Sequence, residues 1–203
     1  VVHATASGDA QLEPERVELA PRTLFDVASL TTVVATGTLA ALLVQEGRLG
    51  LEDRAAERLP GFEAAGKGPV SVRHLLAHAS GLPAWRPYFE VARADPVAGA
   101  AFLAPEQRPP ALGQAFERGR ALVREAVLRE PLEAPPGARA LYGDPAFLAL
   151  GWIVEAAGGA PLPPHPQPPT PTPARPKDFH KNLNFELISR SIVSALLEIS
   201  CSL

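Results

Sequence analysis

The chain has 203 residues, a formal net charge of −3 at pH 7, and 46% hydrophobic and 20% charged residues. This length suits one domain, or one domain with an appendage, and the composition is that of a globular protein. Without a basic excess, we expect no nucleic-acid partner. The single cysteine, Cys201, excludes an internal disulfide and a multi-cysteine zinc site. No apolar run reaches the roughly 18 residues of a membrane span.

The N-terminal region, residues 1–25, lacks a helical pattern and carries Pro14 and Pro21. It predicts a strand remnant followed by a loop. The chain contains no Met and begins at Val1 without a signal-peptide pattern, so we expect a processed or truncated N-terminus. The compartment is therefore unknown from the sequence.

Helical patterns begin at Ser29, a candidate N-cap or first-turn residue. It precedes an apolar stretch that predicts a buried helix ending near Gly47. The apolar positions of this helix are Val33, Leu39, Ala40, Leu43 and Val44. Residues 51–60 predict a short helical turn, and Ser71 is the expected cap of a helix that runs to His78.

Two longer helices are expected further along, over residues 111–130 and 146–157. Between residues 84 and 110 the chain is polar and proline-rich, and no helix is predicted there. The expected hydrophobic anchors of that stretch are its aromatic residues Trp85, Tyr88 and Phe89.

The composition changes near residue 160. Nine of the 23 prolines lie in residues 161–176, which predicts an extended, polyproline-like linker. Residues 177–203 carry apolar residues at i, i+3, i+7, i+11 and i+14, which predicts an amphipathic helix within 182–200. These apolar residues are Phe185, Ile188, Ile192, Leu196 and Ile199. We therefore expect a body over 1–160, a linker, and a tail unrelated to the body.

Four phrases occur in order along the body. They are F-D-V-A-S-L-T-T-V-V-A-T at 25–36, L-V-Q-E-G-R-L-G-L-E-D at 43–53, V-S-V-R-H-L-L-A-H-A-S-G-L-P at 70–83, and P-P-G-A-R-A-L-Y-G-D-P-A-F-L-A-L-G-W-I-V-E at 135–155. Together they resemble the serine beta-lactamase-related family, which includes class C beta-lactamases, penicillin-binding proteins and esterases. The resemblance covers about residues 20–160.

The resemblance implies an α+β parent fold, in which an antiparallel sheet flanked by helices adjoins a helical domain. We expect this chain to be mostly α-helical, with at most a small sheet remnant. The sheet's C-terminal strands have no counterpart in the sequence after residue 160. We therefore expect Leu39, Leu43 and Val44 to lose packing partners and the chain to be marginally stable.

The chemistry that the resemblance implies is acyl transfer through a serine nucleophile. Ser29 matches the nucleophile, Tyr142 the proton-relay tyrosine, and Asp144 the last residue of the second motif. Thr32 occupies the position of the lysine that accepts the serine proton, and threonine has no basic nitrogen. The third motif, H-T-G or K-T-G, does not occur in the chain.

Each of these residues also has a purely structural interpretation. Tyr142 also fits a half-buried aromatic residue, and Asp144 fits a helix cap equally well. His74 and His78 lie four residues apart, but the pattern favours packing over metal binding because no carboxylate accompanies them. Lys67 is interpreted as a loop lysine and not as a substitute base.

Three functions are compatible with the sequence. The first is a serine hydrolase acting on small-molecule esters, beta-lactams or D-amino-acid peptides, with no metal or organic cofactor. The second is an inactive, truncated relative of that family. The third is an interaction module that uses the proline-rich linker and the tail helix, including self-association through that helix. Family members are often periplasmic or secreted, which does not decide the compartment of this chain.

Overall fold

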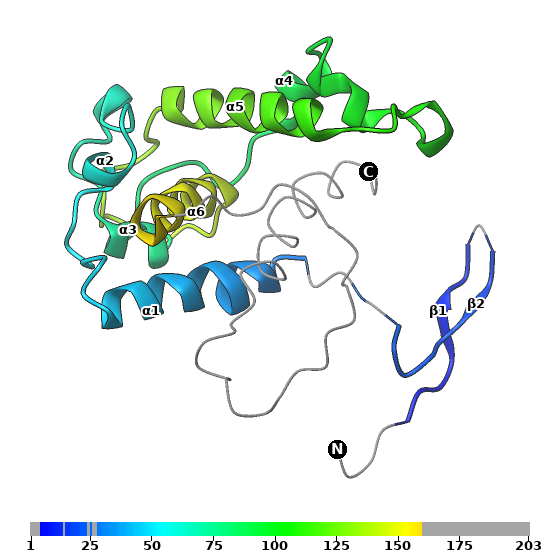
Figure 1. Ribbon diagram of the computed structural model, residues 1–203. Helices are drawn as coiled ribbons and strands as arrows, with labels where there is room; N and C mark the ends of the chain where they lie inside the picture. The colour runs from blue at the N-terminus through cyan, green and yellow to red at the C-terminus, as the bar shows by residue number, and fades with distance from the viewer. Residues whose placement is uncertain (1–4, 14, 24, 26–27, 160–203) are drawn as a thin grey trace.

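The structure is a computed structural model, and it describes residues 5–13, 15–23, 25 and 28–159. The predicted linker (161–176) and tail (177–203), with the helix expected within 182–200, lie outside the described residues. The described part is mostly helical, with one small antiparallel sheet, as expected from the resemblance (Figure 1).

The small sheet is formed near the N-terminus, where a strand remnant was predicted. Strands β1 (Asp9–Gln11) and β2 (Val17–Glu18) pair antiparallel, and the register shifts between Asp9 and Gln11. An ion pair joins Arg16 to Asp9 across the hairpin at 2.8 Å. The hairpin projects away from the helices in Figure 1, so it adds nothing to their core.

The helical elements of the described chain follow the sequence-based expectations in most places. They are the π-helix η1 (Thr32–Gly37), α1 (Thr38–Gln45), α2 (Ala55–Arg58), the 3-10 turn η2 (Ala64–Gly66), α3 (Val72–Leu76), α4 (Phe89–Arg93), the 3-10 turns η3 (Ala98–Phe102) and η4 (Pro105–Gln107), α5 (Gly113–Arg129) and α6 (Asp144–Gly158). The helices predicted over 111–130 and 146–157 correspond to α5 and α6 and are confirmed.

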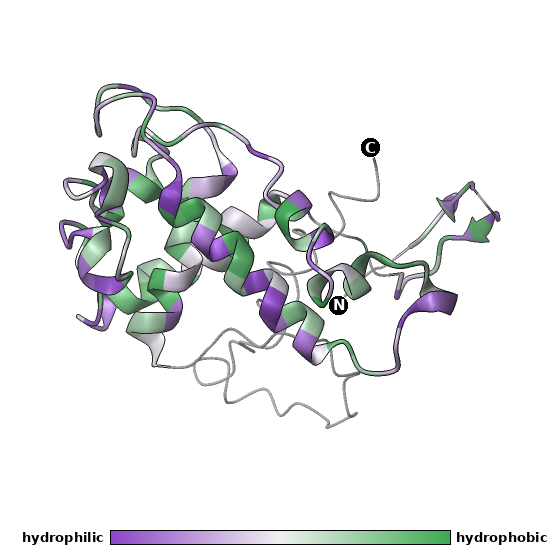
Figure 2. Cartoon of the chain, turned by 90° about the horizontal axis from the view of Figure 1, so that it is seen from above, coloured by the Kyte–Doolittle hydropathy of each residue, from purple (hydrophilic) through white to green (hydrophobic). Residues whose placement is uncertain are grey.

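Helix α6 forms the centre of the core. Ten of its 15 residues are buried, and it packs against η1, α1, α2, α3 and α5. Its N-terminus follows Gly143, and it ends at Gly159, whose φ of +72° is a left-handed conformation that glycine adopts without strain. Figure 1 shows α6 between α5 and α1. Figure 2 shows α5 from above, with hydrophilic and hydrophobic residues alternating, as expected for a helix with one buried face.

The short helix α3 confirms the predicted cap at Ser71. The Ser71 hydroxyl accepts a hydrogen bond from the His74 backbone N–H at 3.3 Å, and the Ser71 N–H donates to His74 Nδ1 at 3.1 Å. This reciprocal pair is a capping box in which histidine takes the place of the usual Glu or Gln. The His74 imidazole therefore has a structural partner.

The first helical segment differs from the sequence-based expectation. The stretch Thr32–Gly37 forms a π-helix, in which the Thr38 N–H donates to the carbonyls of Val33 and Ala35. This stretch is rich in β-branched Thr and Val residues, which crowd the turns of an α-helix. The change of winding leaves Val33 67% exposed, so its predicted place on the buried face is wrong.

The residues of α1 that were expected to lose their packing partners have kept them. Leu39 and Leu43 are buried against α6, and Val44 packs on the same cluster. That expectation was wrong because α6, and not a strand, covers this face of α1. The uncovered apolar residues lie one to two turns earlier, at Leu30, Val33 and Val34, which we call the apolar face.

The stretch from residue 84 to 110 also contains more regular structure than predicted, with α4, η3 and η4. Tyr88 is a buried anchor as expected, and its hydroxyl donates to Glu130 Oε2 at 2.9 Å. Trp85 is 45% exposed, so its prediction as an anchor is wrong. The neighbouring Arg86 forms ion pairs with Glu130 and Glu133. Arg86 and Tyr88 together therefore anchor this segment, and the Trp85 ring is not needed for it.

The apolar face generates a testable prediction about surface chemistry. The combined variant Leu30→Gln, Val33→Thr, Val34→Thr is expected to bind less of a hydrophobic dye such as anilinonaphthalene sulfonate. Its free energy of unfolding should change little, since exposed substitutions usually cost no more than about 0.5 kcal/mol each. Dye fluorescence and urea unfolding measure the two quantities.

The matched control replaces Val91 and Val97 with Thr, since these valines are also exposed but lie outside the apolar face. Dye binding should be nearly unchanged in this control. An equal loss in both variants would show that the dye does not recognise the apolar face.

Candidate active site

Ser29 lies in a turn directly before the first helical segment, and its side chain is exposed. Its carbonyl oxygen accepts two hydrogen bonds from Thr32, one from the backbone N–H at 3.1 Å and one from Oγ1 at 2.7 Å. Within the described part of the chain, the Ser29 hydroxyl has no hydrogen-bond partner and caps no helix. Solvent can reach this hydroxyl, and no basic group adjoins it among the described residues.

The backbone around Ser29 is locally unfavourable. Ala28 has a φ of +44°, a left-handed conformation that residues with a Cβ rarely adopt. The Thr31 hydroxyl is buried and has no hydrogen-bond partner among the described residues, which costs free energy. Such features are concentrated at functional sites, where the surrounding structure holds them in place.

Tyr142 lies in the loop that leads into α6, and its side chain is 52% exposed. Its ring packs against the His78 ring, with 4.5 Å between the centroids and an interplanar angle of 43°. The Tyr142 hydroxyl makes no hydrogen bond within residues 28–159. The phenol is thus held by one face while its polar end stays open to solvent or a ligand.

Asp144 is the first residue of α6, and the N-cap position belongs to Gly143. Its carboxylate makes no capping hydrogen bond, so the cap interpretation of Asp144 does not hold in this structure. A negative charge in the first turn is still favourable because it faces the positive end of the helix dipole. Burial raises the pKa of this carboxyl group, and the nearby His78 opposes that rise.

Ser29 and Tyr142 precede two helical segments that pack against each other. Helix α6 packs on both η1 and α1, and Arg48, after α1, donates to the carbonyl of Ala157 near the end of α6 at 2.7 Å. The end of α1 therefore lies near the end of α6. Ser29 and Tyr142 each precede the N-terminal end of one of them.

His78 is a functional candidate that sequence reasoning treated as packing. Its ring contacts both Tyr142 and Phe147, and its Nδ1 accepts a hydrogen bond from the Gly143 N–H at 3.2 Å. Burial lowers the pKa of this imidazole, and the charge of Asp144 opposes the lowering. The sequence signal was available, since His78 stands within the third phrase of the resemblance.

Lys67 is the lysine that could replace the base missing at position 32. It is fully buried, and its Nζ donates to the carbonyls of Leu128 at 2.9 Å and Glu130 at 2.6 Å, at the end of α5. Burial lowers its pKa, and the charge of Glu130 acts in the opposite direction. A cation there satisfies carbonyls that have no partner within the helix. Lys67 is thus a buried structural residue that binds the C-terminal end of α5.

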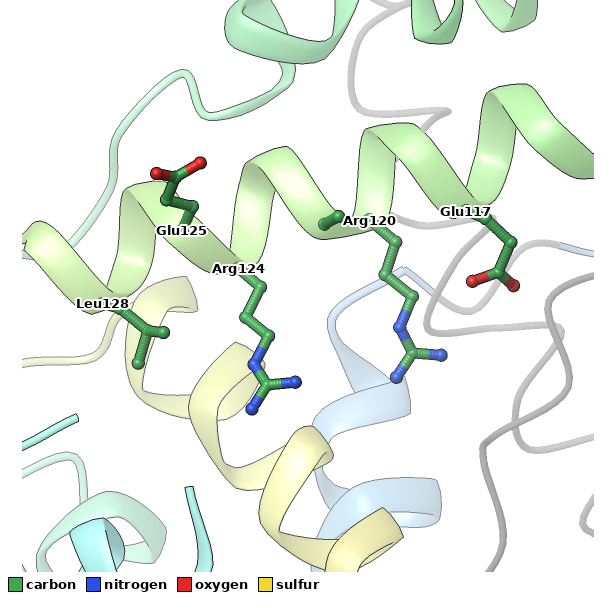
Figure 3. Close-up of a pocket in the computed structure, with 6 residues that line it drawn as sticks. Glu117, Arg120, Arg124, Glu125 and Leu128 are labelled. Atoms are coloured by element: carbon green, nitrogen blue, oxygen red, sulfur yellow. The ribbon is translucent and has the colours of Figure 1, made fainter. Parts of the chain in front are cut away.

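The structure also has an open groove of about 300 Å³ along α5, away from these residues. It is lined by Glu117, Arg120, Ala121, Arg124, Glu125 and Leu128. Figure 3 shows Arg120 and Arg124 pointing away from α5 on the same side. Arg120 forms an ion pair with Glu155 of α6, which assigns it a structural role. The groove contains none of the residues predicted for catalysis.

No cluster of three or more potential metal ligands exists among the residues that the structure describes. In the same part of the chain, no helix is long and apolar enough to cross a bilayer.

The backbone at Gly143 fixes the position of Tyr142 and Asp144. A Cβ added at Gly143 would lie 2.7 Å from the Pro83 carbonyl oxygen and 2.9 Å from that of Ala84. The next residue, Asp144, donates its N–H to the same Ala84 oxygen at 3.0 Å. The loop after α3 therefore packs directly on the start of α6, at a separation that only glycine allows.

We predict that Gly143→Ala lowers the free energy of unfolding by about 1–3 kcal/mol, the usual cost of overpacking. Gly151→Ala is the matched control in the same helix, where an added Cβ meets no atom within 4 Å. It should stabilise the protein by up to about 1 kcal/mol through helix propensity. Urea unfolding of both variants tests this, and equal effects would contradict the close approach at Gly143.

Comparison with known proteins places this geometry in context. The family described as Beta-lactamase matches residues 1–165. A putative D-alanyl-D-alanine carboxypeptidase of Escherichia coli K12 is 34% identical over 157 residues, which is 74% of this chain and 32% of the relative. The chain thus spans about a third of the length of this curated relative.

Two solved structures share the fold with a TM-score of 0.52 each. A penicillin-binding protein from Bacillus halodurans is 26% identical, covering 77% of this chain and 41% of its own. EstCE1, a hydrolase with promiscuous acyltransferase activity, is 28% identical, covering 79% of this chain and 40% of its own.

Proposed function

This chain belongs to the beta-lactamase family of serine hydrolases, and from that membership we propose that it has an acyl-transfer site whose acylation step is severely impaired. The observation that carries the proposal is the contact made by Thr32. At the position of the family's lysine, the Thr32 hydroxyl donates to the Ser29 carbonyl oxygen and has no nitrogen to offer the Ser29 hydroxyl.

The proposed reaction forms a bond between Ser29 Oγ and a substrate carbonyl carbon. The Ser29 proton must leave as this bond forms, and the leaving group must gain a proton as its own bond to the carbon breaks. A serine hydroxyl is a weak nucleophile at neutral pH, so the first transfer needs a base. Tyr142 is the remaining relay residue in our proposal, without the lysine that would share its proton.

Loss of a general base typically slows acylation by about 10²–10⁴-fold. Lys67 does not compensate, because its amine donates to two carbonyls at the end of α5. The loss of the base supports a site that binds carbonyl compounds and turns them over slowly.

The substrate class of the site is proposed from its relatives. Relatives named D-alanyl-D-alanine carboxypeptidase, penicillin-binding protein and hydrolase support D-amino-acid peptides, beta-lactams and esters as compounds to test. We propose no metal or organic cofactor, since the acylation step needs only the serine, a base and an oxyanion donor.

Mass spectrometry of the intact protein after treatment with a fluorophosphonate or a penicillin tests the proposal. We expect no adduct on Ser29 within minutes, and Ser29→Ala sets the background. The Thr32→Lys variant should label Ser29 faster than the natural chain, because it places an amine at the position of the family's lysine. Stoichiometric labelling of the natural chain at Ser29 would contradict the impairment.

A further inference from the structure

Three contacts connect His78 to the short segment that carries Tyr142. The His78 carbonyl oxygen accepts a hydrogen bond from the Leu141 N–H at 2.8 Å, and its Nδ1 accepts one from the Gly143 N–H at 3.2 Å. Between these two bonds, the Tyr142 ring lies against the imidazole. One residue thus holds the backbone on both sides of Tyr142 and the ring itself.

The backbone of His78 is itself held in an unfavourable conformation. Its φ is +53°, which is uncommon for a residue other than glycine. The neighbouring turn holds this conformation, since His78 donates its N–H to Leu75 at 3.1 Å and Ala79 donates to His74 at 2.7 Å. The left-handed turn directs both the carbonyl and the ring of His78 toward the segment 141–143.

We propose that His78 is a pH-dependent positioning residue for Tyr142: the neutral imidazole fixes the tyrosine, and proton uptake at Nδ1 releases it. Nδ1 can accept the Gly143 N–H only while it carries no proton, so the neutral ring must hold its proton on Nε2. Protonation makes Nδ1 a donor facing another donor, and the hydrogen bond is lost. The proposal rests on the proposed function only in assigning Tyr142 to the proton relay.

The groups around His78 determine the direction of the pH effect. Among the described residues, Asp144 at the start of α6 is the charged group that acts on the imidazole, and the phenol of Tyr142 is the other ionisable neighbour. His74, on the preceding turn, is occupied by Ser71. Burial lowers the pKa of His78, so the neutral ring is favoured in the folded protein at neutral pH. Its positioning effect is therefore complete above the ordinary histidine pKa and is lost as the pH falls through the lowered value.

The two tyrosines of the chain make the effect measurable without any enzymatic activity. With 3-fluorotyrosine incorporated, the fluorine resonance of Tyr142 is followed by NMR between about pH 8 and 4.5, which spans the range of histidine titration. We expect a step in the Tyr142 resonance at a midpoint below the usual histidine pKa. In the natural chain the ¹⁵N resonances of the His78 ring should titrate with the same midpoint and show the Nε2–H tautomer above it.

Two variants assign the step. His78→Asn keeps a residue that tolerates a left-handed φ and an oxygen that can accept the Gly143 N–H, but it cannot titrate, so the step should disappear. Asp144→Asn removes the charge that favours the protonated ring, so the step should remain with a lower midpoint. Tyr88 is the internal control. It is buried and its hydroxyl donates to Glu130, so its resonance should not follow the titration of His78.

A Tyr142 resonance that does not change with pH in the natural chain would overturn the proposal. So would a step that persists with the same midpoint in His78→Asn, or ring nitrogens that titrate at a different midpoint from Tyr142. If His78→Asn fails to fold, the comparison of the two midpoints in the natural chain still decides. The acylation experiment on Ser29 is independent, so failure of either proposal is recognised separately.

Discussion

An apolar helix that must be enclosed on every side is the constraint on which the rest of this structure depends. Helix α6 is buried along most of its length, so a single neighbouring helix cannot remove it from water. It is covered by η1, α1, α2, α3 and α5 together. Buried apolar surface contributes about 25 cal/mol per Å², so this enclosure stabilises the described chain. The same enclosure keeps Leu39 and Leu43 buried.

The enclosure of α6 also places the candidate site. Helix α6 packs on η1 and α1, so Ser29 precedes one of two packed helical segments and Tyr142 precedes the other. Gly143 lets the loop after α3 approach the start of α6 closely, and His78 at the beginning of that loop contacts the tyrosine. The core and the site are thus coupled through a few backbone contacts.

In the proposed site, threonine stands at the position of the family's basic residue. Thr32 uses its hydroxyl to bond a backbone carbonyl, which serves the turn and not the nucleophile. Lys67, a fully buried amine, serves the end of α5.

The sequence by itself determined the family, the mostly helical fold and the positions of α3, α5 and α6, because caps, glycines and apolar spacing are local signals. From the matched phrases it also predicts Ser29, Thr32, Tyr142 and Asp144 as site residues, and these stay predictions. Only the tertiary structure decided that Val33 is exposed, that Trp85 is not an anchor, that Lys67 is buried, and that His78 supports Tyr142. Each of these depends on which distant segment packs against the residue. Residues 67 and 128, or 78 and 142, carry no local pattern that reveals their contact, since only the folded chain brings them together.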